Sequence, residues 1–158
     1  MSAPHAAAFA RIATNVAVIT VRDDAGAHGS TANVWAEPCA PPLLLMTLRR
    51  DGETLRRIGN AERFAVNLLA AEQEALALAF ASSDRDRLAT VDHHAGRLDQ
   101  PLLDDALSAF ECGLRDRFPF GDYEIVVGEA RGSELGTETE PLLHYDGAFR
   151  RLAEAAGR

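Results

Sequence analysis

The sequence predicts a mainly β protein in which six or seven antiparallel strands close into a barrel, with two or three short helices beside them. Three observations lead to this prediction. Runs rich in β-branched residues recur along the chain, polar or glycine-containing turns separate them, and strands do not alternate with helices as a parallel sheet requires. The 158 residues suit one domain, residues 1–158, because chains of about 100–200 residues usually form one folding unit.

Each element follows from a local pattern. Helices are expected where apolar residues recur three or four positions apart, and strands where β-branched runs or strict alternation occur. Prolines interrupt a sheet because they cannot donate a ladder hydrogen bond. The predicted elements are, in chain order, a helix over 6–13, strands over 16–21 and 28–36, a proline break over 38–42, a strand over 43–48, a helix over 53–58, a strand over 64–69, a helix over 72–81, strands over 110–114 and 123–130, and short strands at 142–143 and 149–152.

A few side chains indicate which faces of these elements are buried. Phe9 and Ile12 lie three apart, so the first helix is expected to pack that face on a sheet. Leu55 and Ile58 should face inward from the second helix for the same reason. Cys112 alternates with polar neighbours, which predicts an inward position where cysteine serves as a small hydrophobe.

Two polar features stand out from this pattern. Asn67 lies among apolar neighbours in its strand, so its amide must find hydrogen-bond partners. Residues 82–100 are polar and charged without periodicity, which predicts the longest and most mobile loop and a candidate lid.

Composition excludes several classes of function. A net charge of -8 and a pI near 5.0 argue against a nucleic-acid partner, because phosphate binding needs concentrated cationic surface. All 16 basic residues are arginine, which excludes lysine Schiff-base chemistry. No apolar run approaches the roughly 18–20 residues that span a bilayer, and the N-terminus lacks a signal-peptide pattern. We therefore expect a cytoplasmic protein with reduced cysteines and no membrane contact.

The common catalytic motifs are absent. The chain has no Gly-x-Gly-x-x-Gly fingerprint, phosphate loop, Gly-x-Ser-x-Gly elbow or His-Glu-x-x-His zinc pair. His93 and His94 are adjacent, so their side chains diverge, and we expect no metal site. No histidine can be assigned from the sequence as the base that would activate Cys39 or Cys112 as a nucleophile. We therefore assign no catalytic side chain.

Several segments in a fixed order carry a resemblance to a known family. They include the small polar segment Gly29-Ser30-Thr31-Ala32-Asn33, the Pro41-Pro42 pair and the strand over 64–69. Further matching segments are 80–81, 101–103 with 110–112, 121–123 with 127–129, and 141–143 with 149–150. Over nearly the whole chain, their order and spacing resemble the flavin reductase-like, FMN-binding split-barrel family.

The resemblance implies a homodimer of antiparallel six-stranded Greek-key split β-barrels, with flavin at or near the dimer interface. It implies an NAD(P)H-dependent flavin reductase that uses NADH or NADPH to reduce FMN or FAD and supplies the product to a partner monooxygenase. Two alternatives stay open. The barrel could serve as a biosynthetic enzyme with retained flavin, or as a non-catalytic accessory or binding subunit.

Small residues and main-chain groups over 31–33 suit close approach of a flat ring, and charge with a hydroxyl at a helix start suits its phosphate. The resemblance places Asp122 and Tyr123 beside the nicotinamide. The cofactor-binding residues expected on these grounds are Thr31, Ala32, Asn33, Val34, Cys39, Arg49, Arg50, Thr54, Asn67, Phe80, Asp122 and Tyr123.

Three positions depart from the family pattern. Gly52 stands where a serine of a Ser-x-Thr motif is common, and Cys39 stands where a serine precedes the proline pair. Both changes remove a hydroxyl donor. Tyr123 stands where a histidine is usual, and tyrosine cannot become cationic near neutral pH. This third change leaves open which nicotinamide, NADH or NADPH, the protein prefers.

Overall fold

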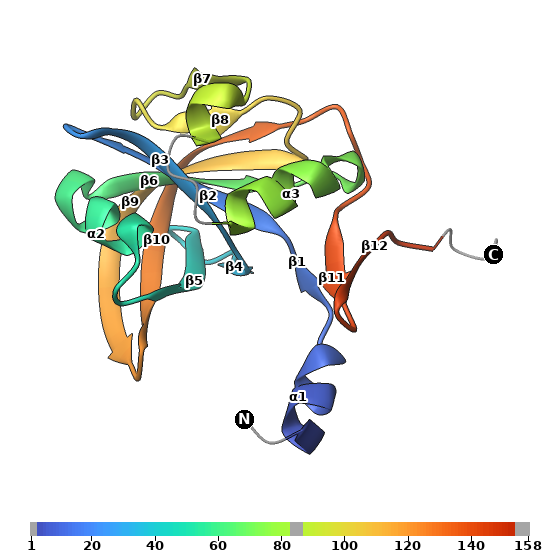
Figure 1. The fold of residues 1–158 in the computed structure, drawn as a ribbon. Helices are drawn as coiled ribbons and strands as arrows, with labels where there is room; N and C mark the ends of the chain where they lie inside the picture. The colour runs from blue at the N-terminus through green and yellow to red at the C-terminus, as the bar shows by residue number, and fades with distance from the viewer. Residues whose placement is uncertain (1–2, 83–86, 154–158) are drawn as a thin grey trace.

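The computed structural model describes residues 3–82 and 87–153, which fold into an antiparallel barrel flanked by helices and by two smaller sheets (Figure 1). The main sheet has the strand order β3-β2-β6-β9-β10-β5-β4, and all of its pairings are antiparallel. Its strands are β2 (Ala17–Asp23), β3 (Gly26–Ala32), β4 (Val34–Glu37), β5 (Leu43–Arg49), β6 (Arg63–Leu68), β9 (Ser108–Phe120) and β10 (Tyr123–Leu135).

The two edges of this sheet meet through a bend in the chain. Strands β3 and β4 lie at opposite ends of the sheet order, yet only Asn33 separates them in sequence. The sheet therefore curls on itself, and β3 with β4 corresponds to the single strand predicted over 28–36. Counted in this way six strands form the barrel, and the prediction of a mainly β antiparallel fold is confirmed.

The remaining elements surround the barrel. One small sheet has the order β1-β11-β12, and the other pairs β7 with β8. These strands are β1 (Thr14–Asn15), β7 (His93–Ala95), β8 (Pro101–Leu103), β11 (Leu143–Tyr145) and β12 (Ala148–Arg150). The helices are α1 (Ala3–Ala10), α2 (Glu53–Ala61) and α3 (Glu74–Ala81), with 3-10 turns η1 (Ala71–Gln73) and η2 (Arg87–Thr90).

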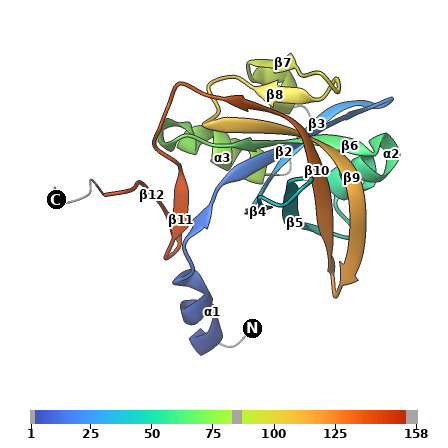
Figure 2. The same cartoon turned by 180° about the vertical axis from the view of Figure 1, so that it is seen from behind.

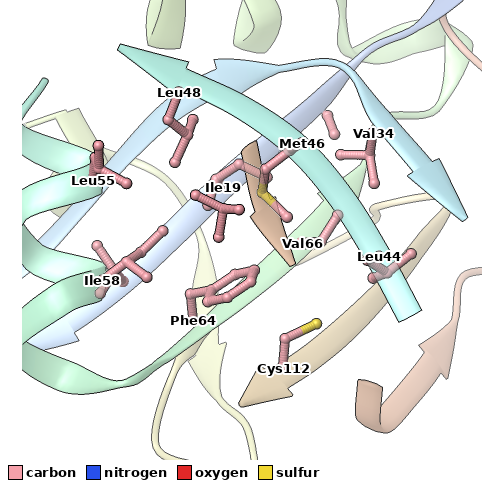
Figure 3. Packing of buried hydrophobic residues seen from close by; sticks show 13 residues of the cluster. Ile19, Val34, Leu44, Met46, Leu48, Leu55, Ile58, Phe64, Val66 and Cys112 are labelled. Carbon is pink, nitrogen blue, oxygen red and sulfur yellow. The ribbon is translucent and has the colours of Figure 1, made fainter. Parts of the chain in front are cut away.

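Apolar side chains from the strands and from α2 fill the barrel interior (Figure 3). Ile19, Phe64 and Cys112 are fully buried there, and α2 adds Leu55 and Ile58 as predicted. Burying each of the larger side chains contributes about 1.5–3 kcal/mol. Burial, and next the neighbouring Glu111, raise the pKa of the Cys112 thiol to about 12, so this cysteine packs as a hydrophobe and forms no thiolate near neutral pH.

A second apolar cluster lies on the outer side of β2. Val18 of β2 packs there with Ala77 and Phe80 of α3, and with Leu142 just before β11. Residues Ala17 to Val21 are consequently buried on both faces of the strand. This double burial fixes α3 beside β3, where it forms one wall of the groove described below.

The prediction for α1 is wrong in its packing. The helix covers Ala3–Ala10 rather than 6–13, and Phe9 and Ile12 are 60% and 57% exposed. Both views show α1 beyond the end of β1, away from the barrel (Figures 1 and 2). The physical reason is that β1 pairs with β11, outside the main sheet, and leads the helix away from it.

The prediction of a structureless loop over 82–100 is also wrong for its described part, which contains η2 and β7; residues 83–86 lie outside the described residues. The carboxylate of Glu111 accepts hydrogen bonds from the main-chain N–H groups of Arg97 and Leu98 at 2.7 and 2.6 Å. Gln100 accepts one from the N–H of Arg22 at 2.8 Å. These long-range bonds hold the segment against the barrel, and they also bury Glu111, which the alternating pattern placed outside.

Candidate functional site

Three adjoining clefts form a groove along the outside of the barrel at the β3–β4 bend. Their volumes are about 560, 400 and 420 Å³. The first two share Thr31, Thr47 and Ala81, and the second and third share Asn33 and Thr47. The groove can therefore receive an elongated ligand with its middle over the 31–33 segment.

A side chain from β1 fixes the backbone at the end of the 31–33 segment. The amide of Asn15 donates to the carbonyl of Val34 at 2.6 Å and accepts from the N–H of Val34 at 3.0 Å. It thus replaces a strand partner at the bend. The side chain of Val34 is buried in the barrel and its N–H and C=O are both bonded to Asn15, so Val34 lines the groove without a free donor for a ligand. Ala32 and Asn33, which both line the groove, have short side chains that leave the backbone approachable.

One end of the groove is the N-terminus of α2. Thr54 is buried there, and its Oγ1 lies 2.7 Å from Oγ of Ser30 on β3. The first amides of a helix have no acceptor within the helix, and the first bond of α2 runs from Arg56 N to Gly52 O. Two hydroxyls and free helix amides on one wall are the kind of donors that suit an anion such as a phosphate.

The charges at this end are paired among themselves. Arg49 donates from Nε and Nη2 to both carboxylate oxygens of Asp51 at 2.9 and 2.8 Å, and these bonds raise the pKa of its guanidinium. Hydrogen bonds from Arg56, then from Arg57, lower the pKa of Glu53 to about 2. Glu53 therefore stays ionised in the groove, with its charge offset by two arginines.

The other expected binding residues divide into two groups. Phe80 and Tyr123 line the same cleft as Thr31, Arg49 and Thr54. By contrast, Cys39, Arg50 and Asp122 line none of the three clefts. Each lies on the exposed surface, and its place in the site stays a prediction.

For Asn67, the structure contradicts the predicted contact with the flavin. Its side chain is fully buried, and its Nδ2 donates to the Val18 carbonyl and the Thr20 hydroxyl at 3.1 and 3.0 Å. Its Oδ1 accepts from the N–H of Leu103 at 2.8 Å. All of its hydrogen-bonding groups serve the barrel, as the expectation of buried partners required, and none is left for a ligand.

Sequence reasoning missed several residues of the groove. Ser30 lies inside the quoted Gly29 to Asn33 segment and could have been included on that signal. His144 and Phe149 come from a hairpin more than a hundred residues away, and no sequence pattern linked them to it. His28 lines the helix end of the groove.

The adjacent histidines outside the groove have separate partners. His93 Nδ1 lies 2.7 Å from the Val91 carbonyl, whereas the ring nitrogens of His94 lie 2.8 and 3.0 Å from Asp104 and Glu134. Within residues 3–82 and 87–153, no three His, Cys, Asp or Glu side chains are grouped so that they could hold a metal ion. Among the helices of the same residues, none has the length and apolar composition needed to cross a membrane.

Residues 9–153 match the sequence profile of the family described as flavin reductase like domain. A probable flavin reductase of Rhizobium meliloti (strain 1021) is 36% identical over 129 residues, which cover 80% of this chain but 42% of that protein. An NADH-dependent FMN reductase of Streptomyces nodosus subsp. asukaensis is 35% identical over 161 residues, covering 93% of this chain and 83% of that protein. The actinorhodin polyketide dimerase of Streptomyces coelicolor is 31% identical over 152 residues, covering 95% and 86%.

Among solved structures, the fold is similar to that of the NADH:FAD oxidoreductase of Streptomyces globisporus C-1027 in complex with NAD and FAD fragments. The TM-score is 0.90 and the identity 32%, over 97% of this chain and 93% of that one.

Proposed function

Because the chain belongs to the flavin reductase like domain family, we propose that it transfers hydride from a reduced nicotinamide to FMN or FAD and releases the reduced flavin to a flavin-dependent monooxygenase. The observation that best supports this proposal is the groove. It offers approachable backbone over 31–33, and hydroxyls with helix amides at one end. Such a groove suits a flat ring joined to a phosphate.

In this proposal the ring lies on Thr31, Ala32 and Asn33, and Val34, whose main chain is bonded to Asn15, fixes the position of that segment. The phosphate lies at the start of α2, where Ser30, Thr54 and the helix amides can donate to it. Arg49 would contribute positive charge only at the rim, because its Nε and Nη2 donate to Asp51, which offsets its charge.

NADH is the donor that we propose in preference to NADPH. The related FMN reductase is NADH-dependent, and the related oxidoreductase structure contains NAD. The charges support the same choice, since Arg49 is paired with Asp51, and Arg56 and Arg57 are paired with Glu53. A second phosphate would find little free positive charge there.

The chemistry requires position rather than a protein acid or base. When bound together, the nicotinamide would supply a hydride with its electron pair to the flavin, and solvent would supply the proton that completes reduction. The chain has to hold the two rings in contact and exclude water between them. Phe80 is the buried aromatic side chain on this wall, and Tyr123 can stack at the rim where it is 43% exposed.

A homodimer is part of the proposal. The outer face of β4, β5 and β10 carries Trp35, Leu45 and Ile125 beside the third cleft, and Phe118 of β9 pairs with Ile125 on that face. Trp35 and Phe118 are 70% and 52% exposed, so this face presents an apolar patch of the kind that marks a protein–protein contact. A second copy would bury it next to the 31–33 segment. Trp35→Glu should then shift the sedimenting species from dimer to monomer.

We also propose that the chain acts as one domain. The interior cluster and the α3 cluster lie on opposite faces of the same strand, β2, so neither can form without it.

The deciding experiment mixes purified protein with NADH or NADPH and free FMN or FAD in air and follows nicotinamide absorbance. We expect flavin-dependent oxidation of NADH that is faster than oxidation of NADPH. Absence of flavin-dependent oxidation with either donor would rule out the reductase.

A second candidate keeps the flavin bound and uses it on an organic substrate. The third cleft, about 420 Å³ and lined by Ile12, Trp35 and Ile125, adjoins the 31–33 segment, and the polyketide dimerase is 31% identical. A purified protein that is yellow favours this candidate, whereas a colourless protein active only with added flavin favours the reductase. A colourless protein without activity favours an accessory subunit.

A further inference from the structure

One wall of the groove comes from outside the barrel, from the β1-β11-β12 sheet. His144 is the central residue of β11 and pairs with Thr14 on β1 and Phe149 on β12. Paired residues of antiparallel strands direct their side chains to the same face. His144 and Phe149 line the second cleft together, and their rings meet edge to face with centroids 5.8 Å apart.

Hydrogen bonds fix this sheet relative to the barrel. Asn15 of β1 bonds the main chain of Val34, as described above, and the N–H of Leu142 donates to the carbonyl of Leu69 at 2.9 Å. The β1-β11-β12 sheet is thus attached to the barrel both through β1 and through the residue before β11. The position of His144 therefore follows from the fold rather than from a loose C-terminal segment.

The imidazole of His144 is available to a ligand. It is the one titratable side chain among the residues that line the second cleft, and no hydrogen bond or ion pair within the described residues engages its ring nitrogens. Neutral imidazole carries one N–H donor and imidazolium carries two. The other walls offer the small side chains of Ala77 and Ala81 and the 31–33 segment.

We propose that His144 contacts the flavin in this cleft and donates a hydrogen bond to the pyrimidine edge of its ring. This inference rests on the proposed function. Reduction places additional negative charge on that edge, and hydrogen bonds to a charged acceptor are about twice as strong as neutral ones. His144 therefore binds the reduced ring more tightly than the oxidised ring, and Phe149 holds the imidazole in orientation.

Two substitutions at His144 separate the N–H donor from the shape of the ring. His144→Phe keeps an aromatic ring beside Phe149 but has no donor, whereas His144→Gln keeps a donor. Tyr145→Phe, at the next position of the same strand and outside the cleft, is the matched control. Dissociation constants for FMN are measured twice, for the oxidised form by fluorescence and for the reduced form by anaerobic calorimetry.

We expect His144→Phe to weaken binding of reduced FMN about 10- to 100-fold and of oxidised FMN by about tenfold or less. His144→Gln should retain most of the affinity, and Tyr145→Phe should match the unmodified protein. The inference is overturned if His144→Phe weakens both forms equally or neither, or if His144→Gln is as weak as His144→Phe. Unmodified protein that binds no FMN and oxidises no NADH with it would overturn the proposed function as well.

Discussion

The hydroxyl of Thr54 tests whether the start of α2 holds a phosphate. Thr54→Val keeps the shape of a residue that is 5% exposed but removes Oγ1, which lies 2.7 Å from Ser30. Loss of that neutral bond should cost about 0.5–1.5 kcal/mol of folding stability. A hydrogen bond to a charged phosphate contributes about 1.5–3 kcal/mol, which corresponds to roughly 10- to 150-fold weaker binding of FMN.

The assay compares FMN with riboflavin, which carries the same ring without the phosphate. Dissociation constants from fluorescence titration should rise for FMN and change little for riboflavin in Thr54→Val. Thr54→Ser restores the hydroxyl and should restore the difference between the two ligands. Equal weakening of FMN and riboflavin would refute the phosphate assignment, because it would mean that the substitution disturbs the ring site or the fold instead.

Three further predictions concern stability. Asn67→Leu should lower the free energy of unfolding in urea by about 2–4 kcal/mol, because it leaves buried partners unsatisfied; a loss below about 1 kcal/mol would contradict the structural role. Gly29→Val should cost about 1–3 kcal/mol, since a Cβ at Gly29 would lie 2.7 Å from Cε1 of Phe80; an unchanged melting temperature would contradict that contact. The carboxylates of Asp104 and Glu134 raise the pKa of His94 above 6.5, so their stabilising effect is complete below about pH 6.5 and is lost as pH rises through the raised pKa. The difference in melting temperature between the unmodified protein and His94→Gln should thus be larger near pH 6 than near pH 9, and the reverse order would disprove it.

The sequence predicted the barrel because its strands carry local signals. The β-branched run of β2 and the prolines after β4 act on the backbone within a few residues, so they can be recognised from the sequence alone. The inward positions of Leu55 and Ile58 followed from helical spacing alone. These features depend on backbone propensity and burial, which short windows of sequence record well.

The misses all depend on contacts between distant parts of the chain. Glu111 is buried because residues 97–98 lie over it and donate to its carboxylate, and alternation along β9 cannot reveal that cover. Asn67 was expected to have buried partners, but only the structure shows that these use its whole amide. His144 reaches the groove through pairing with Thr14, which a scan for local motifs does not detect.

The three departures from the family pattern have unequal weight once they are placed on the structure. Cys39 is exposed, donates to the Pro41 carbonyl and lies outside the groove. Replacing a serine at this position therefore removes no hydroxyl from the three clefts. Gly52 caps α2 without a side chain, yet the helix amides and Thr54 remain beside it. Tyr123 also lines the first cleft, at its rim, and is the departure that changes an aromatic side chain there. The chain should therefore differ from its relatives less in how it binds flavin than in how fast a nicotinamide reacts beside it.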